Sequence, residues 1–405
     1  MKVSIKKGIA KGCVDAPPSK SMAHRMLICA GLSGGECVVH GIAQSKDIQA
    51  TMYCLKAIGV KCEYDGSSVF VKGIDVKTAI AEDKLQCRES GSTLRFFIPI
   101  CLASGQTFEL IGAQRLLERP LGVYSDLCKE KELCFSQDAK GVTVKGPLKP
   151  GSFSVPGNVS SQFISGLLFV LPLLDGDSTI EITLPIESKS YIDMTILAMR
   201  QFGVIASWQD GKTIYLKGNQ RYCPCEVSVE GDYSNSAFLD AFNLIGGQVQ
   251  VGNLSRESIQ GDKVYSEMFR KLESGCPVLE ISDCPDLAPV LFAMAGVMHG
   301  ATFKGTKRLK IKESDRGETM AAELKKFGIK TEIYDNEIIV EPAELKKPEE
   351  AIFGHNDHRI VMANAVLLTL TGGIIEGAEA VTKSFPDFFE KLSSLGIEVE
   401  KIEDK

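Results

Sequence analysis

The longest hydrophobic stretches of this chain have the pattern of buried helices that begin with small polar residues. In residues 19–32, apolar side chains recur three and four positions apart, which places them on one face of a helix. Residues 90–103 and 159–174 repeat this arrangement, with serines ahead of a nearly continuous apolar run. Serine at such a position caps a helix by accepting a hydrogen bond from a free backbone amide. The pattern therefore predicts three buried helices with serine-rich first turns.

A fourth apolar stretch, residues 287–297, is preceded by two acidic residues, Asp283 and Asp286. Asp286 stands at the position of a helix N-cap, where its carboxylate would bond the amides of the first turn. A carboxylate beside a buried helix is also held partly out of water, and that is one way in which proteins prepare a general base. The hydrophobic pattern alone favours neither interpretation.

Between the apolar helices, one sequence pattern recurs. Residues 55–73, 199–218 and 324–342 each contain a helix end, a glycine, a strand, a tight turn and a second strand. The glycine suits a left-handed helix C-terminus, and Asp-Gly or Asp-Asn suits a hairpin turn. Weaker copies lie at residues 127–146 and 392–402. Gly59 and Gly203 are 144 positions apart (203 − 59) with a weak copy midway, so the period is about 72 residues.

A repeat of this length is a small α/β fold in its own right, because solenoid repeats are only about 20–50 residues long. Five or six such units fill the 405 residues. We expect two domains of three units each, the first formed by residues 1–14 and 228–405 and the second by residues 15–227. Both chain ends would lie in one domain, and two connections would form a hinge beside a cleft.

Composition and charge exclude several classes of protein. The net charge is −6, which makes nucleic acid an improbable partner. The N-terminus lacks the apolar core of a signal peptide, and the longest apolar run is shorter than the roughly 20 residues that span a bilayer. The 13 cysteines are scattered and suggest free thiols in a reducing compartment. We therefore expect a cytoplasmic protein without a membrane partner.

Many of the cations lie close to predicted helix starts, unlike ordinary surface charges. These residues are Lys20, Arg25, Arg95, Arg119, Arg316 and Arg359. Taken singly, each is best explained as a solvated surface charge. Together with the serine-rich first turns, they predict a site for a heavily anionic small ligand, because helix N-termini and arginine forks both suit phosphate and carboxylate.

Two segments resemble motifs of nucleotide-hydrolysing enzymes but lack their context. Residues 32–36 read LSGGE, and residues 210–213 read DGKT in a predicted hairpin turn, with Ala206 where a phosphate-binding loop needs glycine. His355 and His358 have the spacing of a metal pair, but their motif offers no third ligand. We therefore expect no metal site at these histidines.

Nine motifs, in order from residue 17 to residue 389, resemble those of the EPSP synthases, the 3-phosphoshikimate 1-carboxyvinyltransferases. They are PPSKSMAHR, SGSTLR, ERPLG, SSQF, SYIDMT, EGDYSNSAF, KESDR, DHR and KSFPDFF. The resemblance implies a two-domain α/β (α+β) fold, an inside-out barrel of six repeated βαβαββ units with the active site in the cleft between the domains. It also implies a monomer that transfers the enolpyruvyl group of phosphoenolpyruvate to the 5-hydroxyl of shikimate 3-phosphate, in the biosynthesis of chorismate and aromatic amino acids. The resemblance implies no metal and no organic cofactor.

The resemblance also implies roles for individual residues. Asp286, Glu313 and Lys20 would be catalytic, with Asp286 accepting the proton of the attacking hydroxyl. The residues expected to bind shikimate 3-phosphate are Lys20, Ser21, Arg25, Ser160, Ser161, Gln162, Ser188, Asp286 and Lys312. The residues expected to bind phosphoenolpyruvate are Lys20, Gly91, Arg95, Arg119, Gln162, Arg316, Arg359 and Lys383.

The chain departs from the family pattern near Gly91. Glu89 adds a negative charge beside a predicted phosphate site, and Phe96 follows Arg95 where the family often has proline. Gly91 itself is kept, and in this family a side chain at that position affects the inhibitor glyphosate. We therefore expect a glyphosate-sensitive protein.

Three other functions remain as alternatives. The related enolpyruvyl transferase that acts on UDP-N-acetylglucosamine shares the fold, but its reactive loop cysteine has no counterpart in residues 113–122. A non-catalytic anion-binding homologue would have lost Asp286, Glu313 or Lys20, and all three are present. A purely structural repeat protein would not need so many cations at helix starts.

Overall fold

The computed structural model describes residues 1–77 and 82–402. The chain folds into two compact units, one formed by Met1–Pro17 with Gly231–Lys405 and the other by Pro18–Glu230. We call them the terminal unit and the central unit. The changes of unit fall after residues 17 and 230, each three positions beyond the boundaries expected from the sequence (17 − 14 and 230 − 227).

Within residues 1–77 and 82–402, six small sheets carry the fold, three in each unit. Five of them have four strands in one shared order: a parallel pair, then a third and a fourth strand that each run antiparallel to their neighbour. The sixth sheet has two parallel strands. This shared order confirms the repeated α/β units that the sequence predicts.

The central unit contains three four-stranded sheets, β14-β3-β5-β4, β6-β7-β9-β8 and β10-β11-β13-β12. Its strands are β3 (Glu36–His40), β4 (Lys61–Tyr64), β5 (Ser68–Lys72), β6 (Lys84–Arg88), β7 (Thr107–Gly112), β8 (Cys134–Gln137), β9 (Gly141–Lys145), β10 (Ser152–Pro156), β11 (Ser178–Thr183), β12 (Ala206–Trp208), β13 (Thr213–Leu216) and β14 (Glu226–Ser228). Its helices are α1 (Lys20–Gly31), α2 (Lys46–Ala57), α3 (Gly91–Ser104), α4 (Gln114–Leu117), α5 (Gly122–Glu130), α6 (Ser161–Val170), η1 (Leu171–Leu173) and α7 (Lys189–Gln201).

The terminal unit contains two four-stranded sheets, β20-β21-β1-β22 and β16-β17-β19-β18, and the pair β15-β2. Its strands are β1 (Lys2–Ile5), β2 (Lys11–Asp15), β15 (Gln248–Gly252), β16 (Val278–Glu280), β17 (Ala301–Lys304), β18 (Thr331–Ile333), β19 (Glu337–Val340), β20 (Ile352–Phe353), β21 (Gly373–Glu376) and β22 (Val399–Ile402). Its helices are α8 (Tyr233–Leu244), η2 (Gly261–Val264), α9 (Tyr265–Ser274), α10 (Ala288–Val297), η3 (Lys307–Ile311), α11 (Arg316–Lys326), α12 (His358–Thr371), η4 (Ala378–Lys383) and α13 (Phe388–Ser394).

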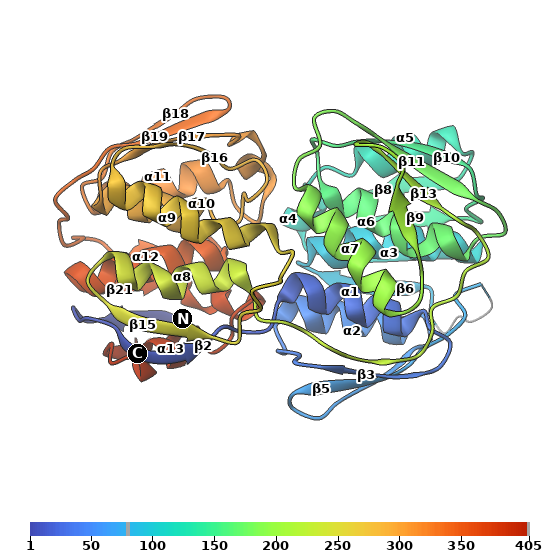
Figure 1. Ribbon diagram of the computed structural model, residues 1–405, viewed down its shortest axis with the longest axis horizontal. Helices are drawn as coiled ribbons and strands as arrows, with labels where there is room; N and C mark the ends of the chain where they lie inside the picture. The colour runs from blue at the N-terminus through green and yellow to red at the C-terminus, as the bar shows by residue number, and fades with distance from the viewer. Residues whose placement is uncertain (78–81, 403–405) are drawn as a thin grey trace. The chain divides into compact units, whose positions relative to one another are not determined.

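In each unit, apolar helices form the core and the sheets lie outside them (Figure 1). Helices α3 and α6 of the central unit and α10 and α12 of the terminal unit are buried along almost their whole length. A helix that is apolar on all sides needs cover on all sides, and the packed helices and small sheets provide it. Phe96 of α3, for example, packs edge-on against Phe169 of α6.

The repeated helix ends adopt the left-handed backbone expected of their glycines. The φ angles are +101° at Gly59, +79° at Gly203 and +87° at Gly328. In the weaker copy at residues 127–146, Glu132 takes the left-handed conformation instead, with φ +55°. A non-glycine residue pays a steric penalty there, which explains why this copy is harder to recognise in the sequence.

The first strand of the chain belongs to the sheet formed by the last strands. Strand β1 lies between β21 and β22 and is antiparallel to both, with Val3 opposite Ile375 and Lys401. Strand β2 pairs in parallel with β15. The pairing of β1 with β21 and β22 confirms the expectation that the two ends of the chain lie in one domain.

In the part of the chain that the structure describes, none of the helices is both long enough and apolar enough to cross a membrane.

The left-handed glycines allow a matched test of backbone strain. A Cβ added at Gly396, which has φ +85°, or at Gly122, which opens α5, would meet no atom within 4 Å. We expect Gly396→Ala to lower the free energy of unfolding by about 1 kcal/mol, because only the backbone conformation opposes it. Gly122→Ala should leave it unchanged or raise it by up to about 1 kcal/mol. Urea unfolding curves measure both, and equal effects would contradict the assignment of strain.

Candidate active site

Asp286 lies at the centre of three cations in the terminal unit. Its Oδ1 atom accepts hydrogen bonds from Arg316 Nη1 at 2.7 Å and from Lys312 Nζ at 3.1 Å. Its Oδ2 atom accepts one from Arg359 Nη2 at 3.1 Å, and its backbone carbonyl accepts a second from Arg359 Nη1 at 3.1 Å. The Asp286 side chain keeps 21% of its surface exposed, so this carboxylate remains within reach of a ligand. We call these four residues the Asp286 cluster.

The guanidinium of Arg316 is the buried centre of charge in this unit. Only 1% of its side chain is exposed, and it donates to three carboxylates, those of Asp286, Glu313 at 2.8 Å and Asp357 at 2.9 Å. Asp357 is fully buried and accepts a further bond from Ser314. A buried cation needs this many partners, because an uncompensated charge away from water costs several kcal/mol. Arg316 is consequently held in one orientation.

Arg359 and Lys383 come from the helices that follow. Asp357 caps α12 by accepting from the amide of Arg359, which places the Arg359 side chain at the start of that helix. Arg359 Nη1 also donates to Ser234 Oγ at 2.6 Å. Lys383 at the end of η4 is buried and donates to the carbonyl of Asn356 at 2.6 Å. The structure therefore brings Arg316, Arg359 and Lys383 together around the residues that precede α12.

The structure excludes one of the two interpretations of Asp286, the helix cap. Helix α10 begins at Ala288, its N-cap is Leu287, and no side chain caps it. The proposed capping role is therefore wrong, because the carboxylate turns to the cations and away from the helix amides. Burial raises the pKa of Asp286, but the positive charges of Arg359, Lys312 and Arg316 outweigh burial and hold this pKa well below its usual range. Asp286 is ionised, and in this state it is a weak base.

A second group of predicted residues meets in the central unit, at the starts of α3 and α6. Arg95 Nη1 donates to Gln162 Oε1 at 3.1 Å, and Gln162 Nε2 donates to Ser92 Oγ at 2.9 Å. The second Arg95 nitrogen, Nη2, donates to the carbonyl of Pro120 at 3.2 Å. The ring of Phe163 lies under the guanidinium, 5.3 Å from its carbon. These bonds fix the side chain of Arg95 beside the first turn of each helix.

Gly91 is the point of closest approach to the arginines. A Cβ on Gly91 would lie 2.5 Å from Arg119 Nη1 and 2.9 Å from Arg95 Nη1. Any larger residue would displace at least one guanidinium, so the glycine keeps room for both cations. Glu89, two residues earlier, is exposed. Gly91, Arg95, Arg119 and Gln162 thus form one group, the Gly91 cluster.

Three serines cap the helices that carry these residues, as the hydrophobic pattern predicts. Ser19 accepts from the amide of Met22, Ser90 from that of Thr93, and Ser160 from that of Gln162. Ser188 precedes α7 in a left-handed conformation with φ +57° and makes no capping bond. Ser161 is the first residue of α6.

Lys20 and Arg25 both lie on α1 but in different surroundings. Lys20, the first residue of the helix, pairs with Asp47 at 2.8 Å, and its side chain is 15% exposed. Arg25 is 2% exposed and donates to the carbonyls of Ser21 and Tyr191 and to the hydroxyl of Thr195. The ring of Phe96 lies 5.4 Å from the Arg25 guanidinium carbon. Phe96, which departs from the family pattern, therefore packs against the buried guanidinium of Arg25. Lys20 and Ser21 are the first two residues of α1.

Several contributors to these clusters escape recognition in the sequence. Asp357 accepts a hydrogen bond from Arg316, and Ser234 accepts one from Arg359. Asp357 and Ser234 lie within two of the nine motifs, but no role was predicted for either. Asp47, the partner of Lys20, and Asp262, a buried acid near Asp286, lie outside those motifs. An Asp ahead of an apolar helix signals a cap, and this signal could have identified Asp357. Nothing in the local sequence marks Asp262 as a neighbour of Asp286.

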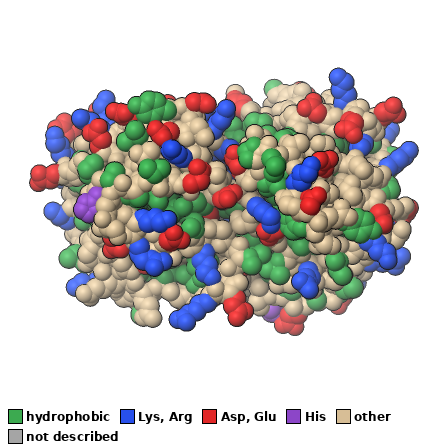
Figure 2. Space-filling model, turned by 45° about the horizontal axis from the view of Figure 1, so that its top comes forward, with side chains coloured by type: hydrophobic (Ala, Val, Ile, Leu, Met, Phe, Trp, Pro, Cys, Tyr) green, Lys and Arg blue, Asp and Glu red, His purple; other side chains and the backbone are tan. Residues whose placement is uncertain are grey.

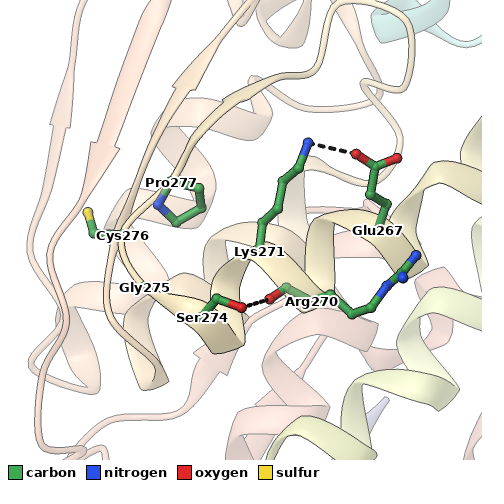
Figure 3. A pocket seen from close by; sticks show the side chains of 7 residues that line it. All are labelled: Glu267, Arg270, Lys271, Ser274, Gly275, Cys276 and Pro277. Atoms are coloured by element: carbon green, nitrogen blue, oxygen red, sulfur yellow. Dashed lines mark hydrogen bonds and ion pairs between the residues drawn. The ribbon is translucent and has the colours of Figure 1, made fainter.

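A separate hollow of 410 Å³ beside α9 has a different character (Figure 3). Lys271 pairs there with Glu267 at 2.7 Å, and the hydroxyl of Ser274 donates to the carbonyl of Arg270 at 2.8 Å. Its charged groups thus bond one another and do not converge on a ligand. Acidic and basic side chains are also interspersed over the face shown in Figure 2. The described residues contain no cluster of three metal-ligating side chains, and His355 instead bonds Glu323 at 2.8 Å.

The fold and the two clusters define a class of protein. It consists of two units of repeated α/β sheets, with cations and acids gathered at the starts of buried helices, and such a site suits small, multiply charged anions. The family model of EPSP synthase (3-phosphoshikimate 1-carboxyvinyltransferase) matches residues 6–280 and 271–392. The chain belongs to the EPSP synthase family.

Named relatives and solved structures agree with this assignment. A 3-phosphoshikimate 1-carboxyvinyltransferase of Clostridium kluyveri is 38% identical over 420 residues, which cover 98% of each chain. One of Clostridium perfringens is 39% identical over 418 residues, again 98% of each chain. An EPSP synthase structure from Acinetobacter baumannii has a TM-score of 0.77 at 23% identity, covering 99% of this chain and 100% of the other. At that identity the structural match supports the fold alone.

Asp262 makes the terminal unit sensitive to pH. This residue is 3% exposed. Burial, and then the negative charge of Asp286, raise its pKa from 3.8 to about 6, against the opposing effects of Arg359 and of the Ser234 hydroxyl. Because the folded pKa lies above the unfolded one, ionised Asp262 costs stability above pH 6, and this cost disappears as the pH falls to 3.8.

We therefore expect Asp262→Asn to raise the free energy of unfolding by about 2 kcal/mol at pH 8, with the gain vanishing near pH 4. Urea unfolding at the two pH values measures the difference. Asp335→Asn is the matched control, because Asp335 is 75% exposed and its loss should change stability by less than about 0.5 kcal/mol at either pH. A gain for Asp262→Asn that is equal at both pH values would contradict the role of its ionisation.

Proposed function

We propose that this protein transfers the enolpyruvyl group of phosphoenolpyruvate to the 5-hydroxyl of shikimate 3-phosphate and releases inorganic phosphate, a step of chorismate and aromatic amino acid biosynthesis. Family membership over nearly the whole chain supports the reaction. The observation that carries the proposal is the Asp286 cluster, in which an accessible carboxylate is held ionised among three cations. Such a group can accept a proton while the cations bind the substrate anions.

The reaction needs protons to move at two places. The 5-hydroxyl loses its proton as its oxygen attacks C2 of phosphoenolpyruvate, and the methylene carbon C3 gains one. The tetrahedral adduct then loses phosphate and a proton from the new methyl group. One side chain cannot easily serve both positions, so two acids in different settings are expected. We assign the hydroxyl proton to Asp286 and the proton at C3 to Glu313, with Lys20 as the further proton-transfer group.

Substrate binding would activate Asp286. In the structure its pKa lies well below the usual range because Arg359, Lys312 and Arg316 attract its ionised form. We expect the phosphate and carboxylate of phosphoenolpyruvate to take up part of the positive charge of Arg316 and Arg359. Asp286 would then share less positive charge, its pKa would rise, and its carboxylate would become a stronger base. The weak base of the unliganded protein thus becomes effective only when substrates are bound.

The remaining predicted residues would hold the two substrates. For shikimate 3-phosphate these are Lys20, Ser21, Arg25, Ser160, Ser161, Gln162, Ser188 and Lys312, and for phosphoenolpyruvate they are Lys20, Gly91, Arg95, Arg119, Gln162, Arg316, Arg359 and Lys383. The Gly91 cluster supports this division, because Arg95 and Arg119 converge on the space that the missing Gly91 side chain leaves. Arg25 would act mainly by fixing Ser21 and Tyr191, since its guanidinium is buried against both. The proposal requires both clusters to serve one reaction.

Two alternatives predict different outcomes of the same assay, which measures phosphate release from phosphoenolpyruvate with each acceptor. Release with shikimate 3-phosphate alone supports the proposal. Release with UDP-N-acetylglucosamine would assign the protein to the related transferase. Release with neither, from folded protein, would favour a homologue that binds anions without catalysis.

Removing the proposed base should abolish most of the activity without removing the binding site. We expect Asp286→Asn to lower kcat by roughly 10²–10⁴, the usual worth of a positioned acid–base group. Asp283→Asn is the matched control, because Asp283 is an exposed carboxylate three positions away (286 − 283), and it should leave kcat unchanged. Steady-state phosphate release measures both. A kcat for Asp286→Asn within a few-fold of the unmodified protein would refute the assignment.

The lowered pKa of Lys312 predicts weaker binding of shikimate 3-phosphate in alkaline solution. Burial lowers its pKa to about 8, with contributions from Arg316 and Arg308, while Asp286 opposes the shift. Lys312 therefore loses its charge as the pH rises through about 8. We expect kcat/KM for shikimate 3-phosphate to fall by up to about tenfold per pH unit above that value.

Replacement of Lys312 by arginine tests this prediction, because arginine stays charged throughout the range. In Lys312→Arg the alkaline fall should move to higher pH, whatever the absolute activity. Lys310→Arg is the control: Lys310 is 49% exposed, and its replacement should leave the profile unchanged. Identical alkaline limbs for both variants and the unmodified protein would show that another group titrates there.

A further inference from the structure

A buried chain of hydrogen bonds runs through the central unit from α1 to the start of α3. His24 Nδ1 lies 2.7 Å from Thr51 Oγ1, and Thr51 Oγ1 lies 2.8 Å from Thr93 Oγ1. Thr93 Oγ1 in turn donates to Ser90 Oγ at 2.7 Å. All four side chains are at most 1% exposed. These hydrogen bonds thus link three helices, α1, α2 and α3, inside the core of the central unit.

The direction of these bonds follows from the number of protons available. The single hydroxyl proton of Thr93 goes to Ser90, so the proton in the Thr51–Thr93 bond must come from Thr51. Thr51 then has none left for His24, and His24 Nδ1 must be the donor. The geometry therefore requires the tautomer of His24 with the proton on Nδ1, which leaves a lone pair on Nε2.

The charge state of His24 agrees with this order. Burial, followed by the positive charges of Lys20 and Arg25, lowers the pKa of His24 well below 6.5. The imidazole ring of His24 is therefore neutral, in agreement with the tautomer that carries its only ring proton on Nδ1. Its Nε2 atom has no hydrogen-bond partner among the described residues. His24 therefore ends the chain, and nothing in the described core competes for its Nδ1 proton.

Both ends of the chain lie next to proposed substrate-binding groups. Ser90 caps α3 and directly precedes Gly91, where the two arginines of the Gly91 cluster converge. Arg95 lies on the next turn of the same helix. At the other end, His24 is on α1, one turn after Lys20. Thr51 is on α2, whose first turn contains Asp47, the partner of Lys20.

We propose that His24, Thr51 and Thr93 are positioning residues, which hold the first turn of α3 in register with Lys20 and thereby place Gly91 and Arg95 for phosphoenolpyruvate. This inference rests on the proposed function for the identity of the ligand. This hydrogen-bond chain acts through Ser90, and its residues would touch no substrate. It also explains why polar side chains occupy a core position at all, since well-packed apolar residues would provide the packing alone. A hydrogen-bond chain adds a fixed direction and spacing that apolar contacts do not.

Kinetics can separate positioning from packing. Thr93→Val and Thr51→Val keep the shape of each side chain and remove the hydroxyl. We expect each variant to raise KM for phosphoenolpyruvate by about tenfold, as the loss of one or two positioned contacts would, while KM for shikimate 3-phosphate stays within about twofold. Thr93→Ser and Thr51→Ser keep the hydroxyl and should restore KM for phosphoenolpyruvate.

A matched control removes a buried hydroxyl that lies outside the chain. Thr369 in the terminal unit is 1% exposed, and its hydroxyl donates to the carbonyl of Val366 at 2.7 Å. Thr369→Val should leave both KM values unchanged even where it lowers the unfolding temperature as much as Thr93→Val does. If Thr93→Val and Thr51→Val lower the unfolding temperature but change neither KM, or raise both KM values equally, the positioning role is refuted.

A spectroscopic test is independent of activity. Long-range ¹H–¹⁵N NMR distinguishes the two neutral tautomers of histidine, and His24→Gln identifies the signal of His24. We expect a neutral ring with the proton on Nδ1, unchanged down to about pH 5.5, where an ordinary histidine is mostly charged. A proton on Nε2, or a titration near 6.5, would overturn the chain. If the unmodified protein released no phosphate with shikimate 3-phosphate, the proposed function would fail, and the NMR result would still decide whether the chain exists.

Discussion

The burial of α3, α6, α10 and α12 on all sides is the constraint on which the rest of the structure depends. Sheets and neighbouring helices cover the flanks of these helices, so polar chemistry can reach them only at their ends. A helix start carries free amides and the positive end of the dipole. In the central unit, serine caps accept hydrogen bonds from some of these free amides. Charged side chains lie beside the helix starts in both units. The location of both clusters at helix starts is therefore a consequence of how the core is packed.

Within the terminal unit, one buried cation organises the rest. Arg316 requires carboxylates on several sides, and Asp286, Glu313 and Asp357 supply them. Each of these acids is thereby fixed relative to the others, although they come from three different segments of the chain. Asp357 also caps α12 and so sets the position of Arg359, and Arg359 in turn donates a hydrogen bond to Asp286. Charge balance and helix capping reinforce each other in this closed arrangement.

Local patterns in the sequence were sufficient to predict much of the fold. The helix-terminal glycines, the hairpins and the serine caps each depend on a few adjacent residues, and the structure confirms them. The capping interpretation of Asp286 was wrong, because three cations from later in the chain bind its carboxylate. The same reason explains why Asp262 and the chain from His24 to Ser90 could not be foreseen. These features depend on contacts between distant segments, and no local sequence pattern indicates such contacts. The roles of the individual site residues remain predictions.

The position of β1 has a consequence for the order in which the protein is made. Among the described strands this one is synthesised before all others, yet its two partners, β21 and β22, lie at the far end of the described residues. The central unit has all of its sheet partners within residues 18–230 and can complete its core while the rest of the chain is still being translated. Strand β1 must wait, unpaired, until these two partners have been translated. A nascent chain of this protein therefore presents an open strand that chaperones or premature partners can engage until β21 and β22 emerge.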